Sequence, residues 1–217
     1  PLMVEFDIAT VAKAAHAKGA KLIVDNTFYS PIYQNPIPLG ADIVVHSATK
    51  YLAGHNDVLA GIVVTNDQAI YDKLFYNLNT TGSTLSPFDS YLLMRGLKTL
   101  KLRMEKATEN ARELVTFLKT LPTVKEVLYT GKGGMISFKV ADESQIPTII
   151  NRLEVITFAE SLGGVESLIT YPRTQTHADI PEDVRLSYGL TNDLLRLSIG
   201  IEDVDDLKQD LKAALGA

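Results

Sequence analysis

Near the start of the chain, apolar positions follow a helical period and then give way to short, continuous apolar runs. Residues 7–18 carry apolar side chains at every third or fourth position, with Asp7 placed to cap a helix and Gly19 placed to end it. Three runs rich in Val and Ile follow, "KLIVDNT", "ADIVVHS" and "AGIVVTN". Because they are apolar on both faces, as strands of a helix-covered parallel sheet are, they predict an α/β fold with a mostly parallel sheet.

A long helix and a set of shorter elements are predicted next. Ser86 can cap this helix, Pro87 suits its first position and Asp89 can complete a capping box. An apolar stripe then continues to Pro122, formed by Leu93, Leu97, Leu100, Met104, Ala107, Ala111, Leu114 and Leu118. The following segments predict two strands around a glycine-rich turn (124–140), a helix (144–153), a strand (196–202) and a terminal helix (203–215). This half is α+β in character, and we expect two domains, residues 1–101 and 102–217.

Composition narrows the range of partners. The 217 residues carry a formal net charge of −5, which argues against binding to nucleic acid or to an anionic membrane. The sequence contains no cysteine, so it can form neither disulfides nor thiolate metal sites. No apolar run reaches the roughly 18 residues of a membrane span. We expect a soluble, cytoplasmic protein with a small-molecule substrate. The chain begins at Pro1 without an initiator Met, which suggests a fragment.

The apolar run "ADIVVHS" is followed by Ala-Thr-Lys, which places Lys50 at the end of a buried strand. Lysine is seldom buried unpaired, so Lys50 is either a solvated surface residue or a chemically active amine. Asp25 ends the preceding strand, and strand ends line the ligand crevice of such sheets. A carboxylate for a protonated ring nitrogen and an amine for a carbonyl are what pyridoxal 5′-phosphate requires, and Ser47 and Thr49 could hold its phosphate. Structural Asp and solvated Lys remain the alternative.

Several motifs together resemble one enzyme family. They are "DNTF", "HSATKYLAGHNDVLAG", the segment 86–100, "AESLGGVESL", the Thr176-His177 pair and "RLSIGIED". In this combination they resemble the pyridoxal-phosphate enzymes of cysteine and methionine metabolism, which include cystathionine γ-lyase, γ-synthase and β-lyase and methionine γ-lyase. The resemblance covers essentially the whole chain. It implies the fold-type I architecture, with residues 1–101 as the C-terminal part of the large cofactor domain and 102–217 as the small domain.

The resemblance also implies roles for individual residues. Lys50 would bind the cofactor covalently, Asp25 would pair with its ring nitrogen, Thr27 would lie near the ring, and Ser47 and Thr49 would bind the phosphate. Arg196 would bind the substrate α-carboxylate, a task suited to a bidentate guanidinium. Ser161 and Thr176 would assist Arg196, and Glu160 would lie near the distal end of a cystathionine substrate.

The expected function is cystathionine γ-lyase, a γ-elimination that gives cysteine, 2-oxobutanoate and ammonia. The residues "SLGG" after Glu160 resemble the γ-lyase and γ-synthase branch more than the β-lyases. The alternatives are γ-synthase or β-lyase, and, outside enzymes, an inactive cofactor-binding fragment. The family implies a homotetramer, a dimer of dimers.

Two departures from the family pattern accompany this resemblance. The upstream phosphate loop, stacking tyrosine and intersubunit arm are not in this sequence, so we expect residues 1–217 alone to be inactive. Relatives also usually carry a further segment, about 11–12 residues or more, between Tyr129 and Gly131.

Overall fold

The computed structural model describes residues 1–216 and divides into two compact units. One unit comprises residues 5–101, and the other comprises residues 1–4 together with the chain from Leu102 onward. Ala217, the last residue of the predicted second domain, lies outside the described residues. The division falls within the longest helix, α4 (Pro87–Leu118). Each unit has its own sheet, with three strands in the first and five in the second.

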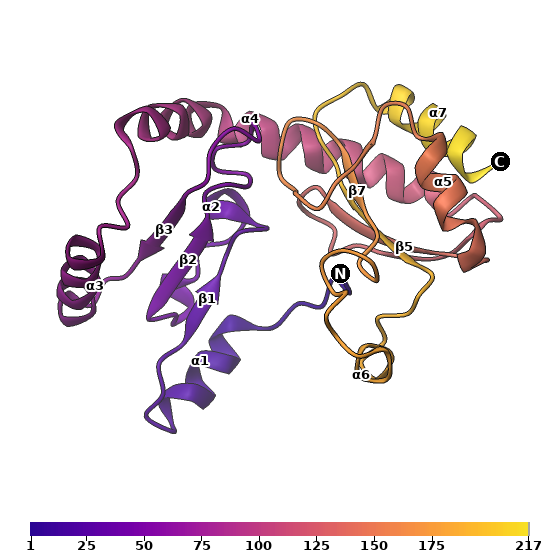
Figure 1. Cartoon of the computed structure of the whole chain (residues 1–217). Coiled ribbons are helices and arrows are strands. Elements are labelled where there is room, and N and C mark those ends of the chain that lie inside the picture. Colours follow the sequence, from indigo (N-terminus) through magenta and orange to yellow (C-terminus); the bar gives the residue numbers. More distant parts are fainter. Residues whose placement is uncertain (217) are drawn as a thin grey trace. The chain divides into compact units, whose positions relative to one another are not determined.

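The first unit contains the predicted helix and all three predicted strands (Figure 1). Asp7 caps α1 by accepting a hydrogen bond from Thr10 N at 2.7 Å, as the sequence predicts. In chain order its elements are α1 (Ile8–His16), β1 (Ile23–Asp25), α2 (Ser30–Tyr33), η1 (Ile37–Leu39), β2 (Ile43–Ser47), β3 (Gly61–Val64) and α3 (Gln68–Thr81), followed by the first half of α4. The sheet order is β1-β2-β3.

The prediction of a mostly parallel sheet does not hold for these three strands. β1 and β2 are parallel, with Asp25 opposite Val45, but β2 and β3 are antiparallel, with Ser47 opposite Gly61. A parallel pair needs a long crossover connection, usually a helix. Residues 48–60 between β2 and β3 form turns and contain no helix, so the chain reverses direction there.

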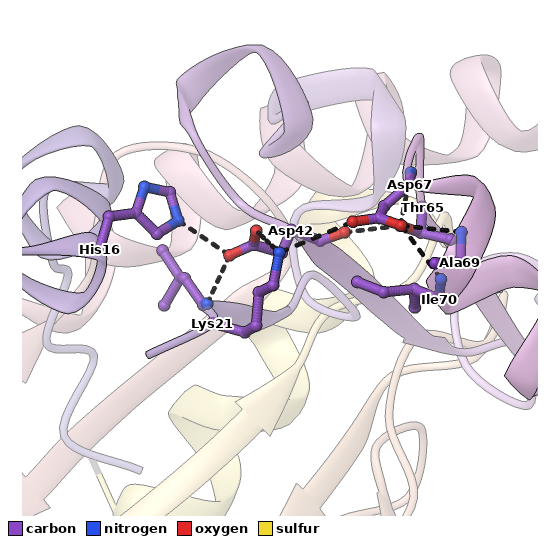
Figure 2. Close-up of polar contacts among 8 residues, drawn as sticks. His16, Lys21, Asp42, Thr65, Asp67, Ala69 and Ile70 are labelled. Atoms are coloured by element: carbon purple, nitrogen blue, oxygen red, sulfur yellow. Dashed lines mark hydrogen bonds and ion pairs between the residues drawn. The ribbon is translucent and has the colours of Figure 1, made fainter. Parts of the chain in front are cut away.

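Asp42 joins the elements at the start of the strands (Figure 2). Its carboxylate accepts hydrogen bonds from His16 at the end of α1 (2.9 Å), from Lys21 (3.2 Å) and from the backbone N–H of Leu22 (2.7 Å). Lys21 also lies 3.6 Å from Asp67. The cluster therefore holds the end of α1 and the approach to β1 against β2.

Helix α3 has no counterpart in the sequence-based prediction. Asp67 caps it by accepting hydrogen bonds from Ala69 N and Ile70 N. The helix buries no residue within the described chain. Its sequence nevertheless has apolar side chains at helical spacing, Ile70, Tyr71, Leu74, Phe75 and Leu78, a pattern that the sequence-based prediction did not use.

The second unit is α+β, as the sequence predicts. Its elements are β4 (Val124–Leu128), β5 (Met135–Val140), η2 (Glu143–Gln145), α5 (Ile146–Arg152), β6 (Thr157–Phe158), β7 (Leu168–Thr170), α6 (Glu182–Ser187), β8 (Leu194–Ser198) and α7 (Val204–Leu215). The sheet order is β4-β5-β8-β7-β6, and all pairs are antiparallel except β6 with β7.

The core of this unit lies between the sheet and the helices α4, α5 and α7. Leu195 and Leu197 of β8 belong to this core, together with Leu114 of α4 and Leu211 of α7. Because side chains alternate along a strand, Arg196 lies on the opposite face of the sheet. The predicted stripe of α4 is buried except for Leu97, which is 40% exposed. Within residues 1–216, no helix is long and apolar enough to cross a membrane.

Candidate functional site

Lys50 lies in a compact turn that directly follows β2. Its backbone N–H donates to the carbonyl of Ser47 (3.2 Å), and its carbonyl accepts from Gly54 N (2.8 Å). A further hydrogen bond, from Ala53 N to the Ala48 carbonyl (2.9 Å), closes the turn. The backbone that carries the lysine is therefore fixed on both sides.

Helix α4 packs closely on this turn at Gly96. A Cβ atom at Gly96 would lie 2.2 Å from the carbonyl oxygen of Ala53 and 2.9 Å from that of Leu52. Only glycine allows this approach, because backbone atoms cannot yield as the end of a side chain can. Gly96 thus lets α4 support the Lys50 turn, a role that its place inside a helical pattern did not predict.

Thr27 connects Asp25, at the end of β1, to the end of β2. Its hydroxyl and its backbone N–H both donate to Oδ1 of Asp25, at 2.6 and 3.0 Å. The same hydroxyl accepts from Ser47 N at 2.8 Å. Within residues 1–216 no hydrogen bond reaches Oδ2 of the exposed Asp25, so this oxygen is available to a ligand. Asp25, Thr27 and Ser47 therefore form one group with the Lys50 turn.

The hydroxyl of Thr49 is already engaged by the backbone. It accepts from Ala60 N at 3.0 Å and donates to the Ala60 carbonyl at 3.3 Å. To donate to a phosphate, Thr49 would have to give up the longer of these bonds. His55 helps to order the loop, because its Nδ1 lies 2.7 Å from the carbonyl of Ala53. Residues 1–216 hold no cluster of potential metal ligands.

Arg196 forms the centre of a second group, on β8. Its Nη2 donates to the backbone carbonyl of Glu160 (2.8 Å) and to the hydroxyl of Thr170 (3.0 Å). Glu160 contributes this carbonyl while its side chain is exposed. The next residue, Ser161, begins a loop that is tied to β8 by a 2.8 Å hydrogen bond from Gly163 N to the Ser198 hydroxyl. The loop that carries Glu160 and Ser161 is thereby held beside the arginine.

Thr176 is placed differently from Glu160 and Ser161. Its hydroxyl lies 2.7 Å from Nδ1 of His177. Burial and the positive charges around it, including those of Arg196 and Arg185, lower the pKa of His177 from its ordinary value. Both effects favour the neutral form of this imidazole.

The predicted site residues form two groups, one in each unit. Asp25, Thr27, Ser47, Thr49 and Lys50 belong to residues 5–101, and Glu160, Ser161, Thr176 and Arg196 belong to the second unit. Sequence reasoning missed Thr170 and Gly96. Thr170 ends a three-residue strand that the sequence-based prediction did not contain, and no motif marked it.

The first group has the chemistry of a pyridoxal-phosphate site. An amine, a carboxylate with one available oxygen, and a hydroxyl at a strand end are the groups that such a cofactor needs, and they fit it. A family model described as "Cys/Met metabolism PLP-dependent enzyme" matches residues 1–216. The chain belongs to this family of pyridoxal-phosphate-dependent enzymes.

Individual relatives lie in the cystathionine branch. A cystathionine γ-synthase/O-acetylhomoserine (thiol)-lyase of Bacillus subtilis is 56% identical over 215 residues, which cover 99% of this chain and 58% of that protein. A cystathionine γ-lyase of the same organism is 46% identical over 231 residues, covering 99% and 61%. The crystal structure of cystathionine γ-lyase from Lactobacillus plantarum complexed with L-serine matches with a TM-score of 0.94 at 43% identity, covering 100% of this chain and 61% of that one. The chain thus spans about three fifths of the length of these relatives.

Proposed function

We propose that Lys50 is the residue that binds pyridoxal phosphate covalently and that moves protons at the substrate α-carbon. The observation that carries this proposal is the Lys50 turn, fixed by hydrogen bonds at the end of β2 beside the strand-end carboxylate Asp25 on β1. When bound, the cofactor withdraws electrons from the substrate α-carbon. A lysine amine at a fixed position can take the α-proton and return one, as a general acid and base. In this proposal residues 1–101 are part of a larger cofactor domain.

Asp25 and its neighbours hold the other end of the cofactor. The carboxylate of Asp25 keeps a proton on the ring nitrogen through its available oxygen, while Thr27 fixes Oδ1 by two hydrogen bonds. Ser47 lies in the group and donates its hydroxyl to the phosphate. Thr49 can donate to the phosphate only if its hydroxyl gives up the hydrogen bond to the Ala60 carbonyl, so we assign it the weaker phosphate contact.

In the second unit, Arg196 binds the substrate α-carboxylate. Arg196 is buried, at 5% exposure, and two acceptors hold its Nη2, which gives the guanidinium a fixed orientation suited to a carboxylate. Ser161 and Thr176 assist from the neighbouring loops. The exposed carboxylate of Glu160 faces the distal ammonium group of a cystathionine-like substrate. Residues 102–217 serve as the small, substrate-binding domain.

The reaction itself takes place at the γ-carbon of the substrate. The sequence predicts γ-elimination on cystathionine, but the similarities favour γ-replacement, in which the thiol of cysteine displaces acetate from O-acetylhomoserine and forms the Cγ–S bond of cystathionine. Identity is higher to the γ-synthase relative than to the γ-lyase relative of the same organism, 56% against 46%. The lengths of the two alignments also favour the γ-synthase. Both alignments cover 99% of this chain, but the alignment with the γ-lyase is 16 positions longer, 231 against 215, as expected if the γ-lyase has extra residues that this chain lacks.

These extra positions fit the segment expected between Tyr129 and Gly131. In this chain the hydroxyl of Tyr129 donates to the Gly133 carbonyl at 2.9 Å, and the hydroxyl of Thr130 donates to the Lys132 carbonyl at 3.1 Å. We therefore propose that the short turn is a true deletion, shared with the γ-synthase relative. The predicted homotetramer stays a prediction.

The test uses the full protein that contains this chain, loaded with cofactor. O-acetylhomoserine with cysteine should give cystathionine and acetate, and this flux should exceed the release of 2-oxobutanoate and ammonia from cystathionine and water. The reverse ranking would favour the γ-lyase. Cofactor binding with neither activity would favour the non-catalytic alternative.

Lys50→Ala tests the central assignment directly. Borohydride reduction followed by peptide mapping should place the cofactor on Lys50 in the wild type, and the variant should lose turnover. A label on the exposed Lys13 or Lys73 would refute the proposal.

A further inference from the structure

Arg196 is the middle member of a row of polar side chains across three strands. In the antiparallel registers Ser137 of β5 lies opposite Arg196, and Arg196 lies opposite Thr170 of β7. Residues opposite one another on antiparallel strands have their side chains on the same face. The arginine is therefore flanked by one hydroxyl on each side.

The two hydroxyls differ in what they do. Thr170 accepts a hydrogen bond from Arg196 Nη2 at 3.0 Å, whereas the buried hydroxyl of Ser137 has no hydrogen-bond partner within residues 1–216. A buried guanidinium needs acceptors, because an unsatisfied charged donor is costly. Thr170 supplies one of these acceptors, and the Glu160 carbonyl supplies another.

The orientation of the Thr170 hydroxyl is fixed by a hydrogen bond that it donates. Thr170 is 1% exposed, and its hydroxyl donates to the carbonyl of Ala159 at 2.8 Å. Since a hydroxyl has one proton to donate, its lone pairs must serve as acceptors toward Arg196. Ala159 N in turn donates to the Ile169 carbonyl at 3.0 Å, so the segment that carries the other acceptor, the Glu160 carbonyl, is held against β7.

We propose that Thr170 is a positioning residue, whose hydroxyl sets the orientation of the Arg196 guanidinium toward the substrate α-carboxylate. This rests on the proposed function of Arg196. Thr170 does not touch the substrate in this proposal. It acts by holding Nη2, so that the remaining donors of the guanidinium face the carboxylate in a constant geometry.

The test compares variants of the full-length holoenzyme in steady-state kinetics. Thr170→Val keeps the shape of the side chain and removes the hydroxyl, and we expect KM for the amino-acid substrate to rise roughly 5- to 30-fold, with kcat within about twofold of wild type. Thr170→Ser restores the hydroxyl and should restore KM. Ser137→Ala is the matched control. It removes the neighbouring hydroxyl, which has no hydrogen-bond partner in the described part of the chain, and KM should not change.

A binding measurement separates positioning from general damage to the fold. The visible spectrum of the bound cofactor is titrated with the substrate amino acid and with the corresponding amine that lacks the carboxylate. Thr170→Val should weaken binding of the amino acid and leave binding of the amine unchanged. Equal loss for both ligands would overturn the proposal. If the valine variant is insoluble, Thr170→Ala undergoes the same titration.

Arg196→Lys distinguishes failure of this inference from failure of the proposed site. If Arg196→Lys weakens amino-acid binding and Thr170→Val does not, the positioning role of Thr170 is wrong and the carboxylate site stands. If Arg196→Lys binds the amino acid normally, the assignment of Arg196 itself falls, and the role of Thr170 falls with it.

Discussion

Asp25 uses its two carboxylate oxygens differently. Oδ1 accepts both hydrogen bonds from Thr27, and Oδ2 accepts none within residues 1–216. Asp25→Asn keeps the size of the side chain but cannot hold a proton on the cofactor ring nitrogen. We expect kcat to fall by about 10²–10³, the range seen when one electrostatic stabiliser is removed, with cofactor content nearly unchanged.

Kinetics and absorbance of the full protein measure this effect. Asp206→Asn, on an exposed position of α7, is the matched control and should retain wild-type kcat. Wild-type turnover in Asp25→Asn would exclude the proposed role of this carboxylate.

The candidate site residues at strand ends could be proposed from the sequence, whereas Thr170 could not. Lys50 and Asp25 follow apolar runs, and a charged residue at the end of a buried strand can be identified from the sequence pattern alone. Thr170 matters only because β7 pairs with β8 in the register that sets it opposite Arg196, and these strands are separated by 23 residues of chain. No local pattern reports such a pairing.

At the scale of elements, the contact between α4 and the Lys50 turn depends on Gly96. Gly96→Ala would gain about 1 kcal/mol of helix propensity, but the new Cβ would meet backbone oxygen 2.2 Å away. Overpacking typically costs about 1–3 kcal/mol, and here the crowded atoms belong to the backbone. The cost of crowding should therefore exceed the gain in helix propensity. We expect a net loss of unfolding free energy and weaker retention of the cofactor.

Denaturant unfolding and cofactor absorbance report the two effects of Gly96→Ala. Lys98→Ala, on an exposed position of the same helix, should show neither loss. A Gly96→Ala variant more stable than wild type would mean that α4 does not press on the turn as described.

Asp42 makes the joining of α1 to the strands sensitive to acid. Hydrogen bonds from Leu22 N, then from His16 and Lys21, hold the pKa of Asp42 well below its usual range. A lowered folded-state pKa stabilises the fold above the ordinary value of 3.8, and this contribution is lost as pH falls below it.

Asp42→Asn removes that dependence. The thermal midpoint of the variant should lie a few degrees below wild type at pH 7. The difference should shrink toward pH 3, because below the ordinary pKa the unfolded wild-type chain takes up a proton at Asp42 that the folded chain does not. Carboxylates remote from Asp42 are the same in both proteins, so their contributions cancel in the difference. A gap that stays constant from pH 7 to pH 3 would contradict this account.

At the scale of the whole molecule, the two units differ in how well they cover their apolar side chains. Within residues 1–216, 24 large apolar residues are exposed, and 16 of them belong to residues 5–101, including Ile23, Val63 and Phe75. We therefore expect residues 1–217, produced alone, to associate through the first unit.

Limited proteolysis of that preparation should degrade residues 5–101 first and leave a fragment from the second unit, whose sheet and three helices enclose a continuous core. Mass spectrometry identifies the resistant piece. Survival of residues 5–101 as the stable fragment would show that the exposed surface does not weaken this unit.

The sequence by itself determined the elements with strong periodicity, which are α1, the strands β1 to β5 and β8, α4, α5 and α7. It also indicated the amine and carboxylate of the candidate site, at the ends of two strands. Local side-chain period and capping chemistry report these features, because they depend on neighbours along the chain. Tertiary structure decided the reversal between β2 and β3, the close approach at Gly96, and the polar row through Arg196. Each of these depends on which distant backbone lies within hydrogen-bonding or van der Waals distance, and linear patterns do not carry that information.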